Sequence, residues 1–156
     1  MFYELHNLGF EMGALARFDM LQDFSQVAEM KKNGVTYLYV SIEQYDDTVL
    51  DNMHKRIHTE QIDNGLNNLV RAGIKVGVST LFGLPYETPE SAQRTLDYIK
   101  GRVDSDHIQY VSMSLFSYHP RTPNGSKNNE RVNHFDFNSG PPNLCYPYVG
   151  FEEGTW

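Results

Sequence analysis

The amino-acid sequence predicts an α/β protein whose parallel sheet is built from about four strand–helix units. Strand-like runs rich in β-branched and aromatic residues alternate with helical runs along most of the chain. Two helical runs end at a glycine, Gly34 and Gly73, directly before the next strand-like run. A Gly-Leu-Pro turn at residues 83–85 leads from a strand-like run into a helix that starts with Pro89. Together these features indicate successive βα units.

The first unit is a short strand, Ala14–Phe18, followed by a helix over about Leu21–Lys32. Asn33 and Gly34 are expected to stop this helix. The residues at core spacing within it are Phe24, Val27 and Ala28.

The second strand is expected over Val35–Ser41, where both faces are apolar, which is typical of a central parallel strand. A helical turn around Asp47–Met53 follows. A longer helix runs from about Thr59, its expected N-cap, to Arg71. Its apolar stripe consists of Ile62, Leu66, Leu69 and Val70.

The third strand is expected over Ile74–Leu81, and Thr88 and Pro89 open a helix that extends to about Arg102. Its inward residues are expected to be Ala92, Leu96 and Ile99, and the fourth strand covers His107–Phe116. Residues 1–123 thus form one α/β unit. Residues 124–156 are rich in Pro, Asn, Gly and aromatic residues, which indicates an irregular tail.

Composition excludes several classes of function. The net charge is −7 and no stripe of Lys or Arg stands out, so the sequence does not predict nucleic-acid binding. It shows no signal peptide and no apolar run of about 20 residues, so we expect a cytoplasmic protein without membrane contact. The single cysteine, Cys145, excludes an internal disulfide and any site built from several cysteines of this chain.

The candidate site is the set of strand carboxyl ends, because these ends meet at one edge of a parallel sheet. Glu43 follows a buried strand, so its carboxylate either binds a ligand or pairs with Arg17 at the neighbouring strand end. Gly83 allows close approach of a ligand, or simply makes a tight turn. His54 and His58 have the i,i+4 spacing of a zinc motif but straddle an expected helix break, and the other histidines lack that spacing. Surface or capping roles are therefore favoured for His54, His58, His119 and His134.

Several segments, in register, resemble the second half of the radical S-adenosylmethionine (SAM) domain. They are Met30–Gly34, Tyr39–Glu43, Val49–Lys55 with His58-Thr59, Arg71–Lys75, Phe82–Thr88 and Tyr118–Pro123. The group most similar includes cobalamin-binding members, methylthiotransferases and oxygen-independent coproporphyrinogen oxidases. The resemblance covers about residues 9–123.

The resemblance implies the latter four βα units, strands 3–6, of a partial (β/α)6 TIM-type barrel. In this family a 4Fe-4S cluster reduces SAM to a 5′-deoxyadenosyl radical. Carried over by position, the SAM-binding residues would be Arg17, Ser41, Glu43, Lys55, Gly83, Leu84, Pro85, Tyr118 and His119. No catalytic residue and no metal ligand is assigned.

The sequence also departs from the family pattern. The CxxxCxxC motif that binds the cluster is absent, Gln44-Tyr45 replaces the usual Ser-Gly, and Arg56 and Tyr86 stand where glycine is common. We therefore expect part of a radical SAM enzyme that is inactive alone and associates through open sheet edges. The alternatives are a non-catalytic SAM- or partner-binding protein and an unrelated α/β enzyme. The substrate is not indicated.

Overall fold

The computed structural model describes residues 7, 9–84, 86–118 and 146–147. It confirms an α/β fold with a four-stranded parallel sheet in the order β1-β2-β3-β4. The elements are β1 (Met12–Ala16), the 3-10 helix η1 (Phe18–Leu21), α2 (Phe24–Lys32), β2 (Val35–Glu43), α3 (Asp47–Asn52), α4 (Thr59–Ala72), β3 (Lys75–Phe82), α5 (Pro89–Asp104), β4 (Tyr110–Leu115), β5 (Ser117–Tyr118) and β6 (Tyr146–Pro147).

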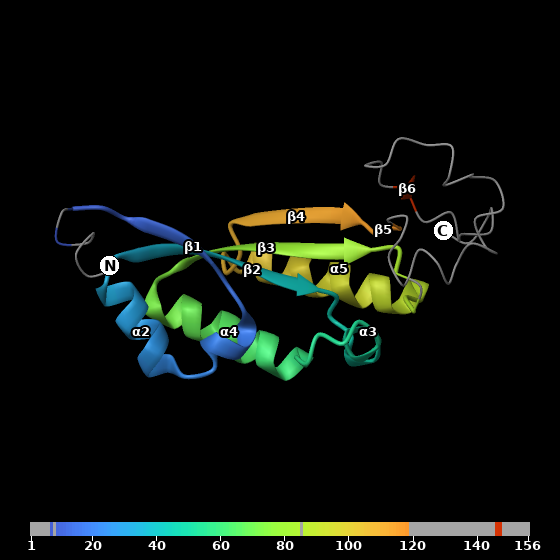
Figure 1. The fold of residues 1–156 in the computed structure, drawn as a ribbon, viewed down its shortest axis with the longest axis horizontal. Helices are drawn as coiled ribbons and strands as arrows, with labels where there is room; N and C mark the ends of the chain where they lie inside the picture. Colours follow the sequence, from blue (N-terminus) through green and yellow to red (C-terminus); the bar gives the residue numbers. More distant parts are fainter. Residues whose placement is uncertain (1–6, 8, 85, 119–145, 148–156) are drawn as a thin grey trace.

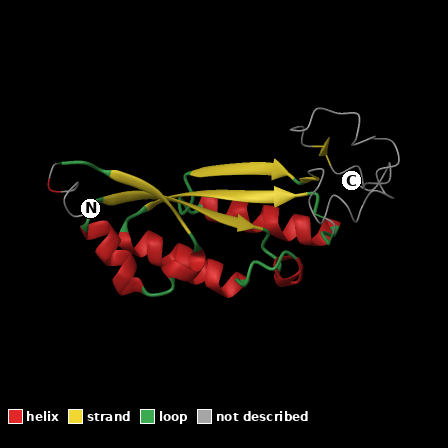
Figure 2. Ribbon diagram, in the orientation of Figure 1, coloured by secondary structure: helices red, strands yellow, loops and turns green. Residues whose placement is uncertain are grey.

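The helices α2, α4 and α5 cover one face of the sheet (Figures 1 and 2). Strand order follows chain order, as expected when each right-handed crossover places the next strand beside the last. All four strands therefore end at the same edge of the sheet. That edge carries the loops after β1, β2 and β3.

The core lies between the helices and the covered face of the sheet. Every second residue of β2 points into it because strand side chains alternate between faces. The buried apolar side chains of β2 and β3 on this face are Leu38, Val40, Ile42, Val76 and Val78. The helices pack against them with Val27, Ile62, Leu66, Leu69 and Ile99.

The other face of the sheet is more polar. Opposite residues share a face, so the register places Ser41, Ser79 and Ser112 in one row across β2, β3 and β4. The Ser79 hydroxyl donates to the Ser41 hydroxyl over 2.9 Å. An adjacent row holds Tyr39, Gly77 and Tyr110, and the two tyrosine rings lie 6.2 Å apart across the glycine.

Most expected strand boundaries are shifted by one to three residues; β4, for example, begins at Tyr110 and not at His107. The shifts at the carboxyl ends of β1 and β2 affect the candidate site. β1 ends at Ala16, two residues before the expected end, because Phe18 turns into η1 and is buried in the core. β2 continues two residues beyond the expected end, so Glu43 is its last residue.

Most helix ends lie close to their expected positions, but α2 begins at Phe24, three residues after the expected start, because Leu21 belongs to η1. Gly73 ends α4 in the left-handed conformation with φ of 68°, and Thr88 caps α5 as expected. The N-cap of α4 is His58 instead of Thr59. Val70 and Leu96 are exposed, because each lies at the border of its helix's apolar stripe.

The irregular tail expected at residues 124–156 lies outside the described residues except for β6, which pairs antiparallel with β5. Among the residues that the structure describes, no helix is both long and apolar enough to cross a membrane.

Candidate functional site

The carboxyl ends of β1 and β2 bring three of the predicted site residues together. Arg17 follows β1 directly, Ser41 lies in β2, and Lys55 lies in the loop between α3 and α4. Their side chains line one small cavity of about 60 Å³, together with Ala16 and Ile57. Residues separated by up to 38 positions thus form one wall of a site.

Glu43 joins this group through Lys55. The Lys55 ammonium donates to the Glu43 carboxylate over 2.5 Å, and the Glu43 side chain is only 14% exposed. Arg17 instead pairs with Asp19 over 3.1 Å, so the expected alternative of a Glu43–Arg17 pair is wrong. The acidic residue of the pair, Glu43, therefore comes from β2, and the basic residue, Lys55, comes from the loop before α4.

The backbone at Glu43 is strained. Its φ is +60°, a region that non-glycine residues adopt rarely, and the β2–β3 register shifts between Ser41 and Glu43. His54 and Arg56, on either side of Lys55, also have positive φ. Backbone strain of this kind concentrates at functional sites, where the surrounding structure holds it in place.

Gly83 and Leu84 form a corner directly after β3, at the same edge of the sheet as the ends of β1 and β2. Both are buried, and Gly83 has φ of +78°. The Leu84 amide donates to the Glu87 carboxylate over 2.9 Å. Burial raises the pKa of Glu87, although the amides of Leu84 and Gly83 and the Gln44 side chain partly offset this.

The assignment of all nine residues to SAM stays a prediction, and three of them lie wholly or partly outside the part of the chain that the structure describes. Pro85 and His119 lie outside the described residues. The backbone of Tyr118 belongs to β5, just beyond the end of β4, while its side chain is not described.

The SAM-binding candidates from the sequence omit two polar residues beside the site, Gln44 and Glu87. Gln44 is fully buried directly after Glu43, and Glu87 accepts from the Leu84 amide. Polar residues in short loops at strand ends usually point to solvent, so nothing in their spacing predicted burial. The one available signal was Gln44 itself, where the related pattern has a small residue.

The sequence matches the family model of the radical SAM superfamily over residues 17–99. The chain belongs to the radical SAM superfamily. The matched segment runs from Arg17 at the end of β1 to Ile99 within α5, so it contains the pair formed by Glu43 and Lys55 and the Gly83-Leu84 corner.

Solved structures confirm the radical SAM fold. One is the radical SAM methyltransferase TsrM from Kitasatospora setae with cobalamin and a [4Fe-4S] cluster bound. Its sequence is 19% identical, the match covers 78% of this chain and 23% of TsrM, and the TM-score is 0.65. Another is the radical SAM enzyme coproporphyrinogen III oxidase (HemN) from Escherichia coli, with 18% identity, coverage of 83% and 30%, and a TM-score of 0.61. The chain thus spans less than a third of either protein. No curated protein matches its sequence.

The residues of this radical SAM chain fit SAM better than they fit an iron–sulfur cluster. Such clusters are held mainly by cysteine thiolates, and the sequence contains one cysteine. Within the described residues, no group of three His, Cys, Asp or Glu side chains could hold a metal ion. The paired Glu43 and Lys55, by contrast, offer a carboxylate and an ammonium, which are groups that form charge-assisted hydrogen bonds to a polar ligand.

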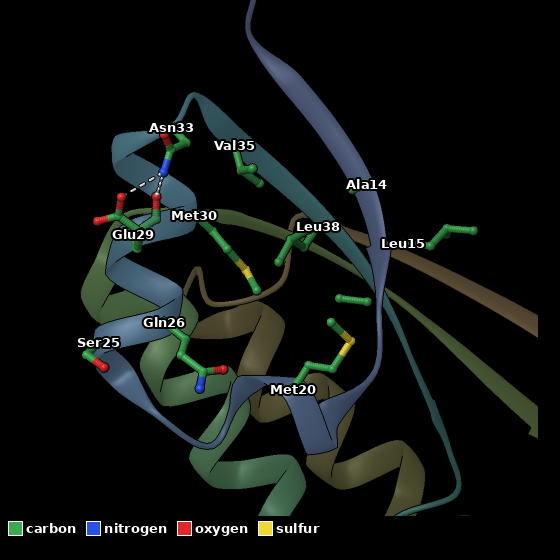
Figure 3. Close-up of a pocket in the computed structure, with 11 residues that line it drawn as sticks. Ala14, Leu15, Met20, Ser25, Gln26, Glu29, Met30, Asn33, Val35 and Leu38 are labelled. Carbon is green, nitrogen blue, oxygen red and sulfur yellow. Dashed lines mark hydrogen bonds between the residues drawn. The ribbon is translucent and has the colours of Figure 1, made fainter. Parts of the chain in front are cut away.

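Two other pockets of the radical SAM chain adjoin this region but contain neither Glu43 nor Lys55. The larger, about 510 Å³, lies between β1 and α2, and Met20, Met30 and Leu38 line it while the Leu15 side chain points away (Figure 3). It is mainly apolar, and its one carboxylate, Glu29, accepts from Asn33. The other is a shallow surface lined by Asp51, His54 and Arg56.

Proposed function

We propose that this chain supplies the SAM-binding side of a radical SAM enzyme, in which SAM is cleaved reductively. The observation that carries the proposal is the Glu43–Lys55 ion pair, which lies beside Arg17 and Ser41 at the carboxyl ends of parallel strands. Ligands of α/β proteins bind at this edge of the sheet.

The site residues offer complementary chemistry for SAM. The Glu43 carboxylate accepts hydrogen bonds from an ammonium or from ribose hydroxyls, whereas Lys55 and Arg17 offer cations for a carboxylate. Gly83 has no side chain, so an adenine or ribose ring can approach the backbone of the turn there. The half-buried position of Glu43 strengthens these contacts because little water screens them.

The cysteine ligands of the 4Fe-4S cluster would then come from polypeptide outside these 156 residues. The sequence has a single cysteine, whereas a 4Fe-4S cluster in this family takes three thiolates from the protein. We therefore propose that the chain binds SAM but does not cleave it alone.

Equilibrium dialysis with radiolabelled SAM tests the binding proposal. The wild-type chain should bind SAM saturably, and Lys55→Met and Glu43→Gln should each weaken binding about tenfold or more, which corresponds to about 1.4 kcal/mol. Lys32→Met is the matched control, because Lys32 forms an exposed ion pair with Glu29 over 3.9 Å, in helix α2. Equal binding by Lys55→Met and the wild type would overturn the proposed role of the pair.

Anaerobic reconstitution with iron and sulfide tests the second half of the proposal. The chain alone should show no stoichiometric absorbance of a 4Fe-4S cluster. A full spectrum, and cleavage of SAM by the reconstituted chain after reduction, would contradict the assignment of the cluster to other polypeptide.

A further inference from the structure

Gln44 is a fully buried polar side chain directly after the candidate ligand-binding residue Glu43. Burying an amide is costly unless its donors and acceptors are paired. The Gln44 Nε2 group donates to the Leu81 carbonyl over 2.7 Å, and its Oε1 accepts from the Thr95 hydroxyl over 2.9 Å. One side chain thus connects the end of β2 to the end of β3 and to helix α5.

The backbone around Gln44 is fixed on both sides. Its amide donates to the Ile42 carbonyl over 2.8 Å, which closes a tight turn around Glu43. The next amide, that of Tyr45, donates to the Thr95 hydroxyl over 2.9 Å. Glu43 therefore lies inside a turn whose outgoing end is tied to α5.

This arrangement explains how Glu43 keeps a φ of +60°. A strained residue relaxes unless its neighbours hold it, and here the register shift between Ser41 and Glu43 places Gln44 in the interior. The buried amide then anchors the turn to two other elements. Without the anchor, the chain after Ser41 is free to continue as ordinary strand, which would turn the Glu43 side chain away from Lys55.

We propose that Gln44 is a positioning residue that holds Glu43 against Lys55 and keeps the loops after β2 and β3 at a fixed distance. The inference deepens the proposed function and rests on it for its functional meaning, since Gln44 acts through Glu43 and does not itself contact SAM.

Gln44→Glu is the sharpest test, because it changes one donor to an acceptor at nearly constant volume. An ionised carboxylate still accepts from Thr95 but repels the Leu81 carbonyl, whereas a protonated one donates to it again. The titratable groups beside it are its chain neighbours Glu43, which pairs with Lys55, and Tyr45, together with Glu87, whose charged form the Gln44 amide favours. The defect should therefore appear at pH 7.5 and be rescued at pH 5.5, with the wild type measured at both values to correct for Glu87.

Gln22→Glu is the matched control. The Gln22 amide donates to the carbonyls of Phe18 and Gln61 over 2.6 and 2.9 Å, so the same substitution disturbs a comparable bridge away from the site. Hydrogen exchange of the Tyr45 and Leu84 amides reports the two loops directly, since both donate to side-chain acceptors. Urea denaturation reports global stability.

At pH 7.5, Gln44→Glu should raise exchange of these two amides about tenfold more than its loss of global stability explains, and weaken SAM binding at least tenfold. Both effects should reverse at pH 5.5. Gln22→Glu should lower global stability. Any change that it causes in the exchange rates of the two amides or in SAM affinity should be no larger than that loss of stability explains. Equal behaviour of the two variants would overturn the proposal. If the wild type does not bind SAM, the proposed function fails, and the exchange data still decide whether Gln44 positions the loops.

Discussion

The rings of Tyr45 and Tyr98 stack with their centroids 3.6 Å apart and their planes 9° from parallel. Both hydroxyls donate to the carboxylate of Asp63, over 2.7 and 2.8 Å, and Arg102 pairs with the same carboxylate. Tyr45 belongs to the loop that follows Glu43 and Gln44, whereas Tyr98 and Arg102 lie in α5. This group therefore ties the site loop to two helices through one carboxylate.

Asp63→Asn should lower the free energy of unfolding by about 2 kcal/mol at pH 7, because it weakens several hydrogen bonds to one charged acceptor. Burial alone would raise the pKa of Asp63, but the hydrogen bonds from Tyr45, Tyr98 and Arg102 outweigh it and hold the pKa below the ordinary value. The carboxylate thus stabilises the fold above about pH 4, and this contribution is lost as the pH falls through the lowered pKa. Urea denaturation between pH 2 and 7 measures it. Asp97→Asn, at an exposed partner of Gln93, should change little; an equal loss in both variants would contradict the role of Asp63.

The two tyrosines should make the fold sensitive to alkali. Burial, followed by the hydrogen bond to Asp63, raises the pKa of Tyr45 to about 12 and also raises that of Tyr98. Because the folded pKa is the higher one, this stabilisation is complete below about pH 10 and is lost as the pH rises further. Tyrosinate absorbance and circular dichroism should show that ionisation of these residues coincides with unfolding. Ionisation at pH 10 with the fold intact would be inconsistent with the buried, bonded phenols.

Gly77→Ala should destabilise the protein by about 1–3 kcal/mol, a typical cost of overpacking. A Cβ at this position would meet the Tyr37 hydroxyl and would lie 2.9 Å from the Tyr39 ring. Gly101→Ala is the opposite case, since a Cβ there meets nothing within 4 Å in helix α5. It should stabilise by up to about 1 kcal/mol. Thermal denaturation of both variants measures the contrast, and a neutral Gly77→Ala would show that the tyrosine row is not packed on the glycine.

Arg56→Gly should stabilise the chain by about 0.5–1 kcal/mol. Arg56 has φ of +54°, and the left-handed region costs a residue with a Cβ about 1–2 kcal/mol, which the higher entropy of an unfolded glycine partly offsets. Arg56→Ala keeps the Cβ and removes the guanidinium, so it separates strain from charge. Urea denaturation should rank glycine above both arginine and alanine. Equal stability of the glycine and alanine variants would mean that the loop relaxes when the side chain is removed.

Sequence reasoning predicted the units of the fold because their signals are local. Strand alternation, the glycine at Gly73 and the cap and proline at Thr88-Pro89 each act within a few residues, and the structure confirms the elements that they delimit. The convergence of Arg17 and Ser41 followed from the rule that parallel strands end at one edge, whereas Lys55 was a candidate only through the resemblance to the radical SAM family. The units and the meeting of the strand ends thus depended on periodicity and topology.

The remaining features depend on tertiary contacts that leave no periodic signal. The Glu43–Lys55 pair requires the loop before α4 to fold back over β2, and the burial of Gln44 requires a register shift at the strand end. The Phe18 side chain, two residues after β1, packs against Gly65. A Cβ added at Gly65 would lie 2.7 Å from the Phe18 ring. Such choices depend on the space left by distant segments, so local propensity does not predict them.

The location of bound SAM tests the account most directly. Adding SAM to the ¹⁵N-labelled chain should shift the amide signals of Ser41–Gln44, Lys55 and Gly83-Leu84 in the NMR spectrum, and Lys55→Met should reduce these shifts at equal SAM concentration. Shifts confined to the apolar pocket near Met20 and Met30, or no shifts at saturating SAM, would contradict the assignment of the strand ends as the SAM site.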